Sequence, residues 1–310
     1  MTNKVMIVGT GNVGASIAFA ILNQRTAVRE IILTDIIAKD ADGEAKDLSD
    51  ALVSAPSHLK IRSGTYKDAK DCDIVIISAG AAQRPNESRN NLLGRNANIL
   101  KGMIDQIMDS GFKGIIIMVT NPVDTMAYLA WKFSGLPPEK IISTGTMLET
   151  ARLRKRISEY IDVNPKSISA FQMGEHGDSG FSVWSLANLS GQPIGNLLRQ
   201  KELAEIEKYI INEVYEIIEQ KGATYYGIST CVVDIVNCIL NDEKRILPIS
   251  SYHEYEGVFY GSPTIIGRRG VIRQIDLKIS EVEGMKLEKS IQALRAEIKS
   301  LKSKGCPKLD

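Results

Sequence analysis

A histidine set between glycines is the residue in this chain best suited to acid–base chemistry. His176 lies in the segment GEHGD at 174–178, and the chain contains three histidines in all. An imidazole titrates near neutrality, so it can exchange a proton with a ketone or an alcohol. The flanking glycines favour an accessible loop, although this segment alone is equally consistent with a structural histidine. We expect His58 and His253 to be structural.

A glycine-rich turn near the start of the chain has the pattern of a dinucleotide-binding site. It follows an apolar run, opens an amphipathic stretch and consists of Gly9, Thr10, Gly11, Asn12, Val13 and Gly14. Asp35 comes 21 residues after the last glycine. Such glycines let a pyrophosphate approach backbone N–H groups at a helix N-terminus, and the acid would accept from the adenine ribose and repel a 2′-phosphate. The pattern predicts NAD in preference to NADP, with a purely structural turn as the alternative.

Two further polar segments follow apolar runs. AGAAQRPNESR at 79–89 comes after the run 73–78, and NPVD at 121–124 comes after the run 114–120. Doubly wound folds bind ligands at the carboxyl ends of their strands. Both segments are therefore candidates for ligand contacts, with a solvated loop and a turn before a helix as the alternatives.

Apolar runs alternate with amphipathic stretches through the first half of the chain. The runs predicted to be strands cover 4–9, 30–35, 73–78, 114–120 and 140–144. The stretches predicted to be helices cover 13–24, 39–55, 90–110 and 123–134. The runs are continuous in Ile and Val, as in strands buried on both faces. This order predicts an α/β fold with a Rossmann-type, doubly wound parallel sheet.

The pattern changes after Gly145. We expect a helix over 148–161, strands over 167–173 and 181–189, two helices divided at Gly222, β-rich segments between 245 and 276, and a last helix from 280 to about 302. These elements predict a second, mixed α+β domain. We expect residues 1–145 to bind the dinucleotide and residues 146–310 to bind the substrate, across a tightly packed boundary.

The composition is typical of a folded globular protein. Of the 310 residues, 44% are hydrophobic and 24% charged, and 38 basic against 37 acidic residues give a net charge of +1. Nucleic acid and acidic membranes are therefore not expected partners. No apolar run approaches the about 18 residues of a spanning helix, and the four cysteines form no metal or redox motif. We expect a cytoplasmic protein without a metal.

Taken together, these segments resemble the L-lactate/malate dehydrogenase family over about residues 4–300. The resemblance is carried by GTGNVG at 9–14, AGAAQRPNESR at 79–89, NPVD at 121–124, GTMLETARLR at 145–154, GEHGD at 174–178 and KGATYYG at 221–227. It implies hydride transfer between NADH and a small 2-oxo acid. It also implies a homo-oligomer, a homotetramer or homodimer.

The resemblance implies a role for each matching residue. His176 resembles the proton donor to the substrate carbonyl, Arg89 the loop residue that polarises that carbonyl, and Arg152 the guanidinium that binds the substrate carboxylate. Asn121 resembles a residue beside the nicotinamide and the substrate, and Thr224 one that lines the substrate pocket. The implied cofactor-binding residues are Gly9, Gly11, Asn12, Val13, Gly14, Asp35, Gly80 and Asn121.

Gln83 distinguishes between the two branches of this family. The malate dehydrogenases place an arginine at this position, whereas the lactate dehydrogenases place a glutamine. A second substrate carboxylate facing neutral Gln83 would lack a countercharge. The resemblance therefore implies interconversion of pyruvate and L-lactate. A broader, hydroxyisocaproate-type L-2-hydroxy acid dehydrogenase and a non-catalytic NAD-binding homologue are the alternatives.

Glu149 stands where the family has an aspartate that partners the histidine. A carboxylate there fixes the imidazole tautomer and raises the pKa of His176 by favouring the imidazolium. The extra methylene must bend or shift to reach the same nitrogen. We expect Glu149 to orient His176 with a lower turnover than in typical relatives.

Two other departures concern the substrate pocket and regulation. Glu213 and Val214 stand where many lactate dehydrogenases have alanines, and an inward Val214 would favour pyruvate over branched 2-oxo acids. Many bacterial relatives bind fructose 1,6-bisphosphate through an arginine, matched here by Arg154, and a histidine, replaced here by Ser169. We expect weak or absent activation by this sugar bisphosphate.

Overall fold

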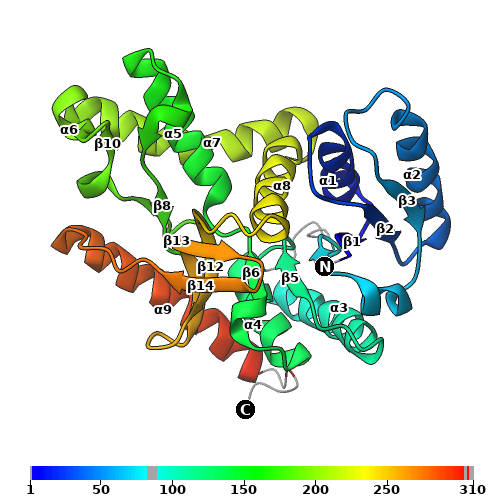
Figure 1. The fold of residues 1–310 in the computed structure, drawn as a ribbon. Helices are drawn as coiled ribbons and strands as arrows, with labels where there is room; N and C mark the ends of the chain where they lie inside the picture. The colour runs from blue at the N-terminus through cyan, green and yellow to red at the C-terminus, as the bar shows by residue number, and fades with distance from the viewer. Residues whose placement is uncertain (1, 82–88, 304–305, 307–310) are drawn as a thin grey trace.

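A sheet of nine strands runs through the centre of the molecule (Figure 1). The computed structural model describes residues 2–81, 89–303 and 306. The strand order is β14-β13-β12-β6-β5-β4-β1-β2-β3. The parallel strands are β1 (Lys4–Val8), β2 (Glu30–Thr34), β3 (Lys60–Ser63), β4 (Ile74–Ile77), β5 (Ile115–Met118) and β6 (Ile141–Ser143). The predicted parallel sheet is confirmed, whereas the sequence does not predict β3, because this edge strand has no buried apolar run.

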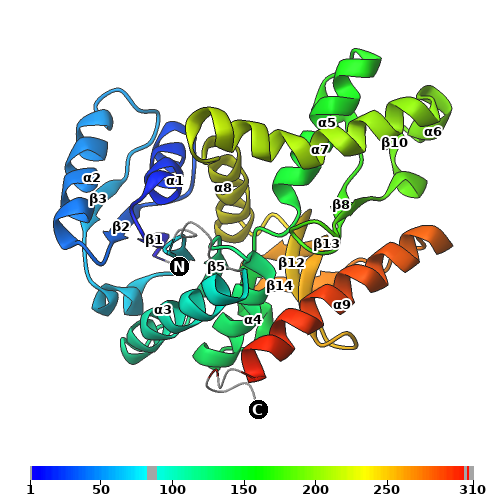
Figure 2. The same ribbon diagram turned by 180° about the vertical axis from the view of Figure 1, so that it is seen from behind.

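Helices cover both faces of this sheet (Figures 1 and 2). The first face is covered by α1 (Asn12–Asn23), α2 (Ala38–Ala51) and α8 (Tyr226–Leu240). The second face is covered by α3 (Arg89–Asp109), α4 (Val123–Ser134) and α9 (Glu281–Ser303). Each set of helices shares one apolar core with the strand residues on its side, since successive strand side chains point to opposite faces. The predicted helices match these bounds closely, except that α2 ends four residues early.

The second half of the chain extends the same sheet. It contributes β12 (Arg245–His253), β13 (Val258–Gly267) and β14 (Gly270–Gln274), which pair antiparallel in sequence order. β12 pairs antiparallel with β6 through Ser250 and Ser143. The sheet therefore crosses the boundary near residue 145, and β6 is not left as an exposed edge strand.

The strands expected over 167–173 and 181–189 are shorter than predicted. The structure has β7 (Ile168–Ser169), β8 (Gln172–Met173), β9 (Phe181–Ser182), β10 (Asn188–Leu189) and β11 (Gln192–Pro193). β7 and β10 belong to a three-stranded sheet with β11, whereas β8 and β9 form a separate pair. The expectation of two continuous strands was wrong because the chain changes sheets on each side of the 174–180 loop.

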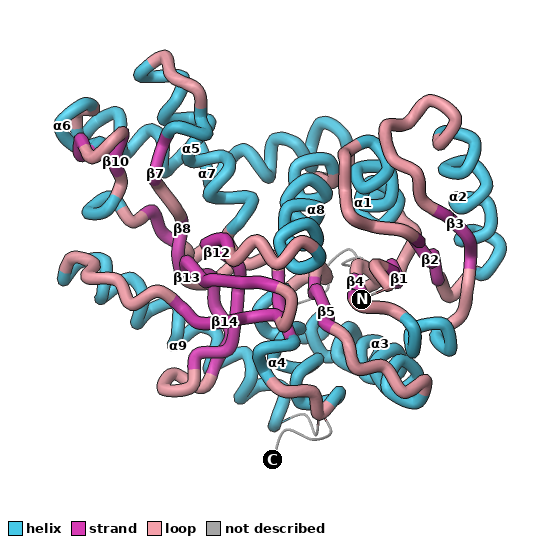
Figure 3. Tube along the Cα trace, in the orientation of Figure 1, coloured by secondary structure: helices cyan, strands magenta, loops and turns pink. Residues whose placement is uncertain are grey.

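A third, smaller core lies beside the sheet. It joins α5 (Met147–Ile161), α6 (Ile194–Leu197) and α7 (Gln200–Lys221) to β7. The short 3-10 helices are η1 (Tyr66–Asp71), η2 (Pro138–Lys140), η3 (Pro165–Ser167) and η4 (Trp184–Leu186). Figure 3 shows α7 running from this outer core to α8. The predicted break at Gly222 is confirmed, because this glycine ends α7 with a left-handed φ of 85°.

No single helix of the described residues is both long and apolar enough to cross a membrane. Only α7 and α8 together reach that length and apolarity, and they are bent by 118° at the break between them.

Candidate active site

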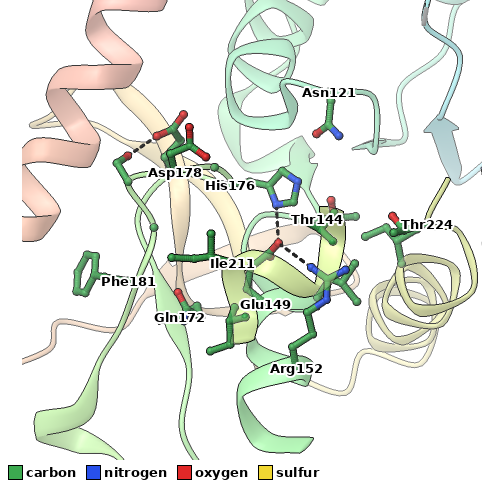
Figure 4. Close-up of a pocket in the computed structure, with 18 of the residues that line it drawn as sticks. Asn121, Thr144, Glu149, Arg152, Gln172, His176, Asp178, Phe181, Ile211 and Thr224 are labelled. Atoms are coloured by element: carbon green, nitrogen blue, oxygen red, sulfur yellow. Dashed lines mark hydrogen bonds and ion pairs between the residues drawn. The ribbon is translucent and has the colours of Figure 1, made fainter. Parts of the chain in front are cut away.

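A cavity of about 390 Å³ opens beside the carboxyl ends of β5 and β6 (Figure 4). Val119 and Asn121 follow β5, and Thr144 follows β6. Most of the other lining residues come from α5, the 175–182 segment and α7, and further ones come from α1, α8, α9 and the turn between α7 and α8. The cavity therefore lies at the edge of the sheet where doubly wound folds bind their ligands.

His176 and Glu149 face each other in this cavity. Glu149 lies in the first turn of α5, and its Oε1 is 3.2 Å from Nδ1 of His176. The contact is close but not directed as a hydrogen bond, and Glu149 Oε2 has no hydrogen-bond partner among the described residues. Burial disfavours the charged imidazole, but attraction to Glu149 outweighs this effect and raises the pKa of His176 to about 9. Burial alone would raise the pKa of Glu149, yet the imidazolium lowers it below its ordinary value.

Asp124 holds the main chain of His176. It lies in the first turn of α4 with 2% of its surface exposed, and its Oδ2 accepts the backbone N–H of His176 at 2.7 Å. Burial raises the pKa of Asp124 to about 6, although this N–H favours the carboxylate. Within the NPVD motif, the sequence predicted a ligand contact for Asn121 and no role for Asp124. The contact to His176 spans 52 residues, so no local pattern predicts it.

Arg152 lies one turn along α5 from Glu149. Its side chain is 8% exposed, lines the cavity, and places Nη1 3.8 Å from Glu149 Oε1. On its other side, Nε is 3.3 Å from Oε2 of Glu213 on α7. The buried guanidinium is thus compensated by two carboxylates, as a buried charge requires. The sequence identified Glu213 only by its bulk, so its ion pair with Arg152 is a finding of the structure.

Asn121 and Thr224 also line the cavity. The backbone oxygen of Asn121 accepts from Nδ2 of Asn96 at 3.3 Å, and Oδ1 of Asn96 accepts from the backbone of Ala81 at 2.9 Å. One side chain therefore links the segment after β4 to the segment after β5. Thr224 follows the glycine that ends α7.

The glycine-rich turn brings main-chain atoms into close contact. Gly9 has a φ of 95°, a left-handed conformation that favours glycine. A Cβ on Gly14 would lie 1.8 Å from the oxygen of Gly9. Gly11, the N-cap of α1, is different: a Cβ there would meet nothing within 4 Å, and no side chain caps the helix. Backbone N–H groups at this end remain available to an anion.

Asp35 follows β2 beside this turn. Its Oδ2 accepts from the backbone N–H and hydroxyl of Thr10 at 2.7 and 3.1 Å, and its Oδ1 accepts from the N–H of Ile37 at 3.1 Å. Each carboxylate oxygen can accept more than one hydrogen bond, so capacity remains for ribose hydroxyls. Val13 lines the cavity from the first turn of α1, next to Asn12. The residues present therefore fit a dinucleotide that runs from Asp35 to the cavity.

The loop after β4 is described only at its ends. A Cβ on Gly80 would lie 2.5 Å from Cγ2 of Thr120, so the strand-end segments pack closely there. Gln83 lies outside the described residues, and Arg89 is the first residue of α3.

Of the remaining residues named from the sequence, Val214 lines the cavity, whereas Arg154, Ser169 and His253 do not. This position of Val214 is the one that the pocket prediction requires. Arg154 donates through Nε to the oxygen of Ala170 at 2.8 Å, and Ser169 is exposed in β7. His253 stacks on Tyr260, and burial lowers its pKa to about 4. In the described part of the chain, no group of three or more His, Cys, Asp and Glu side chains is arranged to hold a metal ion.

Comparison with known proteins gives matches over nearly the whole chain. Residues 3–143 match the family model for the lactate/malate dehydrogenase NAD binding domain, and residues 146–304 match the alpha/beta C-terminal domain of the same family. An L-lactate dehydrogenase of Lactococcus lactis subsp. cremoris is 42% identical over 97% of this chain and 99% of its own length. L-lactate dehydrogenase 1 of Bacillus cereus is 42% identical over 94% of this chain and 96% of its own length.

Solved structures give the same result. A lactate dehydrogenase from a Medee basin deep-sea metagenome library aligns with a TM-score of 0.94 and 42% identity, over 96% of this chain and 98% of that protein. The minor L-lactate dehydrogenase of Enterococcus mundtii in its ligand-bound form aligns with a TM-score of 0.93 and 39% identity, over 95% and 96% of the two chains. The predicted fold class and NAD-binding domain are thus confirmed, and the chain belongs to the lactate/malate dehydrogenase family.

Proposed function

We propose that the chain is an NAD-dependent L-lactate dehydrogenase, which interconverts pyruvate and L-lactate. The observation that carries the proposal is the placement of His176, Glu149 and Arg152 around one cavity at the carboxyl edge of the sheet. These groups supply a proton donor, a carboxylate to orient it, and a guanidinium for an anionic substrate. The full-length similarity to proteins named L-lactate dehydrogenase supports the same activity.

Arg152 binds the substrate carboxylate in this proposal. A guanidinium can form two parallel hydrogen bonds with a carboxylate, which orients the substrate as well as holding it. The low exposure of its side chain strengthens this pairing, because less water competes for the charge. The substrate carbonyl then lies toward His176.

His176 holds the proton that the substrate oxygen receives. Its Nδ1 faces Glu149, which leaves Nε2 for the substrate. With a pKa of about 9, the ring carries its proton at neutral pH and can donate it as the carbonyl becomes an alkoxide. The neutral ring accepts the proton in the reverse direction. The chemistry that NADH supplies when bound is a hydride for C2 of the substrate.

The choice among 2-oxo acids depends on residues around the methyl group of pyruvate. We assign Gln83 to this position and Arg89 to the carbonyl, with Asn121 and Thr224 along the wall. A neutral glutamine leaves the second carboxylate of oxaloacetate without a countercharge. Val214 lines the cavity and reduces the room for a branched side chain. A broader 2-hydroxy acid dehydrogenase is the second candidate, because other 2-oxo acids share the carboxylate and carbonyl that Arg152 and His176 would contact.

The cofactor and the assembly follow the same reasoning. Asp35 favours NAD over NADP, with Gly9, Gly11, Asn12, Gly14 and Gly80 forming the backbone site beside it. We infer a homotetramer or homodimer, in which exposed apolar residues such as Phe19 of α1, 51% exposed, would be covered. The four cysteines are unpaired, which is consistent with the reducing cytoplasm that we propose. Ser169 leaves Arg154 without the histidine of the sugar-bisphosphate site, so activation is weak or absent.

One steady-state experiment tests these assignments. NADH oxidation is measured with pyruvate, oxaloacetate and 2-oxoisocaproate, each with and without fructose 1,6-bisphosphate, and NADPH replaces NADH in a parallel series. We expect kcat/KM to be highest for pyruvate with NADH, and KM to be unchanged by the sugar bisphosphate. A higher value for 2-oxoisocaproate would establish the broader enzyme. Binding of NADH without oxidation by any of these acids would indicate the non-catalytic homologue.

A further inference from the structure

Arg152 is held between two carboxylates that come from different helices. Glu149 lies one turn away on α5 and approaches Nη1 at 3.8 Å, whereas Glu213 comes from α7 and approaches Nε at 3.3 Å. The two acids therefore contact different nitrogens of one guanidinium. Figure 4 shows Glu149 between His176 and Arg152, so one contact belongs to the histidine pair already described. The contact from Glu213 has no part in that pair.

Glu213 is itself fixed by two neighbours. Its Oε1 is 3.3 Å from Nζ of Lys155 and also accepts from the hydroxyl of Tyr209. Nζ of Lys155 lies 2.9 Å from the same hydroxyl, which closes a ring of three side chains. Tyr209 and Glu213 are four residues apart on α7, and Arg152 and Lys155 are three apart on α5. Both pairs therefore lie on the facing sides of their helices.

The charges along this contact alternate from the surface inward. Lys155 is 53% exposed at its side chain, Glu213 is 16% exposed, and Arg152 is 8% exposed. A buried carboxylate is costly unless it is paired and hydrogen-bonded, and here Glu213 has a partner for each oxygen. The outer cation offsets Glu213, which leaves the guanidinium able to bind a further anion on its cavity side.

We propose that Glu213 is a positioning residue: it holds Nε of Arg152 from behind, so that the terminal nitrogens of the guanidinium face the cavity and bind the substrate carboxylate. The inference rests on the proposed function. Arg152 lines the cavity, whereas Glu213 lies behind it on α7. Glu213 therefore acts on the substrate through Arg152, and its loss weakens substrate binding more than it slows the chemical step.

Variants at position 213 separate the charge from the bulk of the side chain. Glu213→Leu removes the carboxylate that lies 3.3 Å from Nε while keeping bulk, and we expect the KM for pyruvate to rise about tenfold, within the range of coupling between contacting side chains. Glu213→Gln keeps the shape but loses the charge, so its KM should rise by a comparable factor. In both variants kcat at saturating pyruvate changes less than KM, as expected when ground-state and transition-state binding are lost together.

Binding measurements and a matched control complete the test. Oxamate, in which an amino group replaces the methyl group of pyruvate, should bind the NADH complex of Glu213→Leu about tenfold more weakly, while the Kd for NADH is unchanged. Glu216→Leu makes the same substitution at an exposed position one turn away on α7 and should change neither value. Lys155→Met leaves Glu213 in place without its outer cation and should raise KM by a smaller factor, which keeps the inference testable if Glu213→Leu does not fold.

The outcomes distinguish the inference from the function beneath it. A wild type that reduces no pyruvate would overturn the proposed function, and this inference with it. An active wild type would overturn the inference alone if Glu213→Leu or Lys155→Met kept the wild-type KM and oxamate affinity. The inference would also be overturned if kcat and the melting temperature fell while KM did not change, because a purely structural contact gives that result.

Discussion

The dinucleotide turn and the substrate cavity are built in different ways. The turn consists of main chain: a Cβ on Gly14 would meet the oxygen of Gly9 at 1.8 Å. The cavity consists of side chains, such as His176, Glu149 and Arg152, whose charges compensate one another. A backbone site depends on the lack of a Cβ atom at a few adjacent glycines. A side-chain site depends on distances between residues far apart in the sequence. The two sites should therefore respond differently to substitution.

His176→Gln should have the largest effect and should be confined to the cavity. Glutamine can still contact the substrate oxygen but cannot transfer a proton as an imidazolium does. We expect kcat for pyruvate reduction to fall by about 10²- to 10⁴-fold, the usual contribution of a general acid. NADH should bind with its wild-type Kd in a fluorescence titration, because the turn is untouched. A loss of NADH binding as large as the loss of kcat would show that the two regions are not separable.

Glu149→Gln should move the pH profile rather than abolish activity. Reduction requires protonated His176, so kcat/KM for pyruvate should be level below a pKa of about 9 and fall above it. Without this carboxylate, burial opposes the charged imidazole and only attraction to Asp124 remains against it, so the pKa of His176 falls below about 9. The falling limb then shifts to lower pH, and reduction at pH 8 drops strongly. Lactate oxidation, which needs the neutral ring, should lose its acid limb in the same variant. A profile unchanged from the wild type would contradict this assignment.

Two glycine substitutions test whether the backbone site affects stability and NADH binding separately. Gly14→Ala forces a Cβ against main chain, and we expect a loss of about 1–3 kcal/mol in the free energy of unfolding, as in other overpacked sites. Gly11→Ala places its Cβ in open space at the N-cap of α1, so the unfolding free energy should change by at most about 1 kcal/mol. The Kd for NADH should rise in this variant, because the methyl group occupies the approach to the N–H groups.

Thermal unfolding and NADH titration measure both variants. Equal melting temperatures with equal NADH affinities would show that the turn does not bind the pyrophosphate.

The same contrast explains which features could be predicted from the sequence. Gly14 and Asp35 belong to one strand–helix–strand unit, so local spacing predicts their shared edge, and the parallel sheet follows from runs such as 114–120. The pairing of β12 with β6 could not be predicted, because it joins Ser250 to Ser143 across more than a hundred residues without a pattern at either end.

The candidate site shows the same limit. The flanking glycines of His176 left a structural role equally open, and the resemblance supplied the proposed roles of His176, Glu149 and Arg152. The contact between Asp124 and the backbone of His176 and that between Glu213 and Arg152 depend on how α4 and α7 pack against other segments. Packing of this kind leaves no periodicity in the residues that make the contact.

Glu149→Asp should have the smallest effect. The informative result is whether kcat for pyruvate reduction rises or falls. The Nδ1–Oε1 distance of 3.2 Å is short enough for an ion pair, yet the contact is not directed as a hydrogen bond. The longer side chain therefore supplies charge to His176 while aligning the ring poorly. Aspartate, which the resemblance places here, would restore alignment without altering the charge, so we expect kcat for pyruvate reduction to rise severalfold, since small misplacements of a catalytic group are costly. The pH profile should stay near that of the wild type, in contrast to Glu149→Gln. An unchanged or lower kcat would mean that charge alone determines the contribution of this carboxylate, and that the cavity has adapted to the extra methylene.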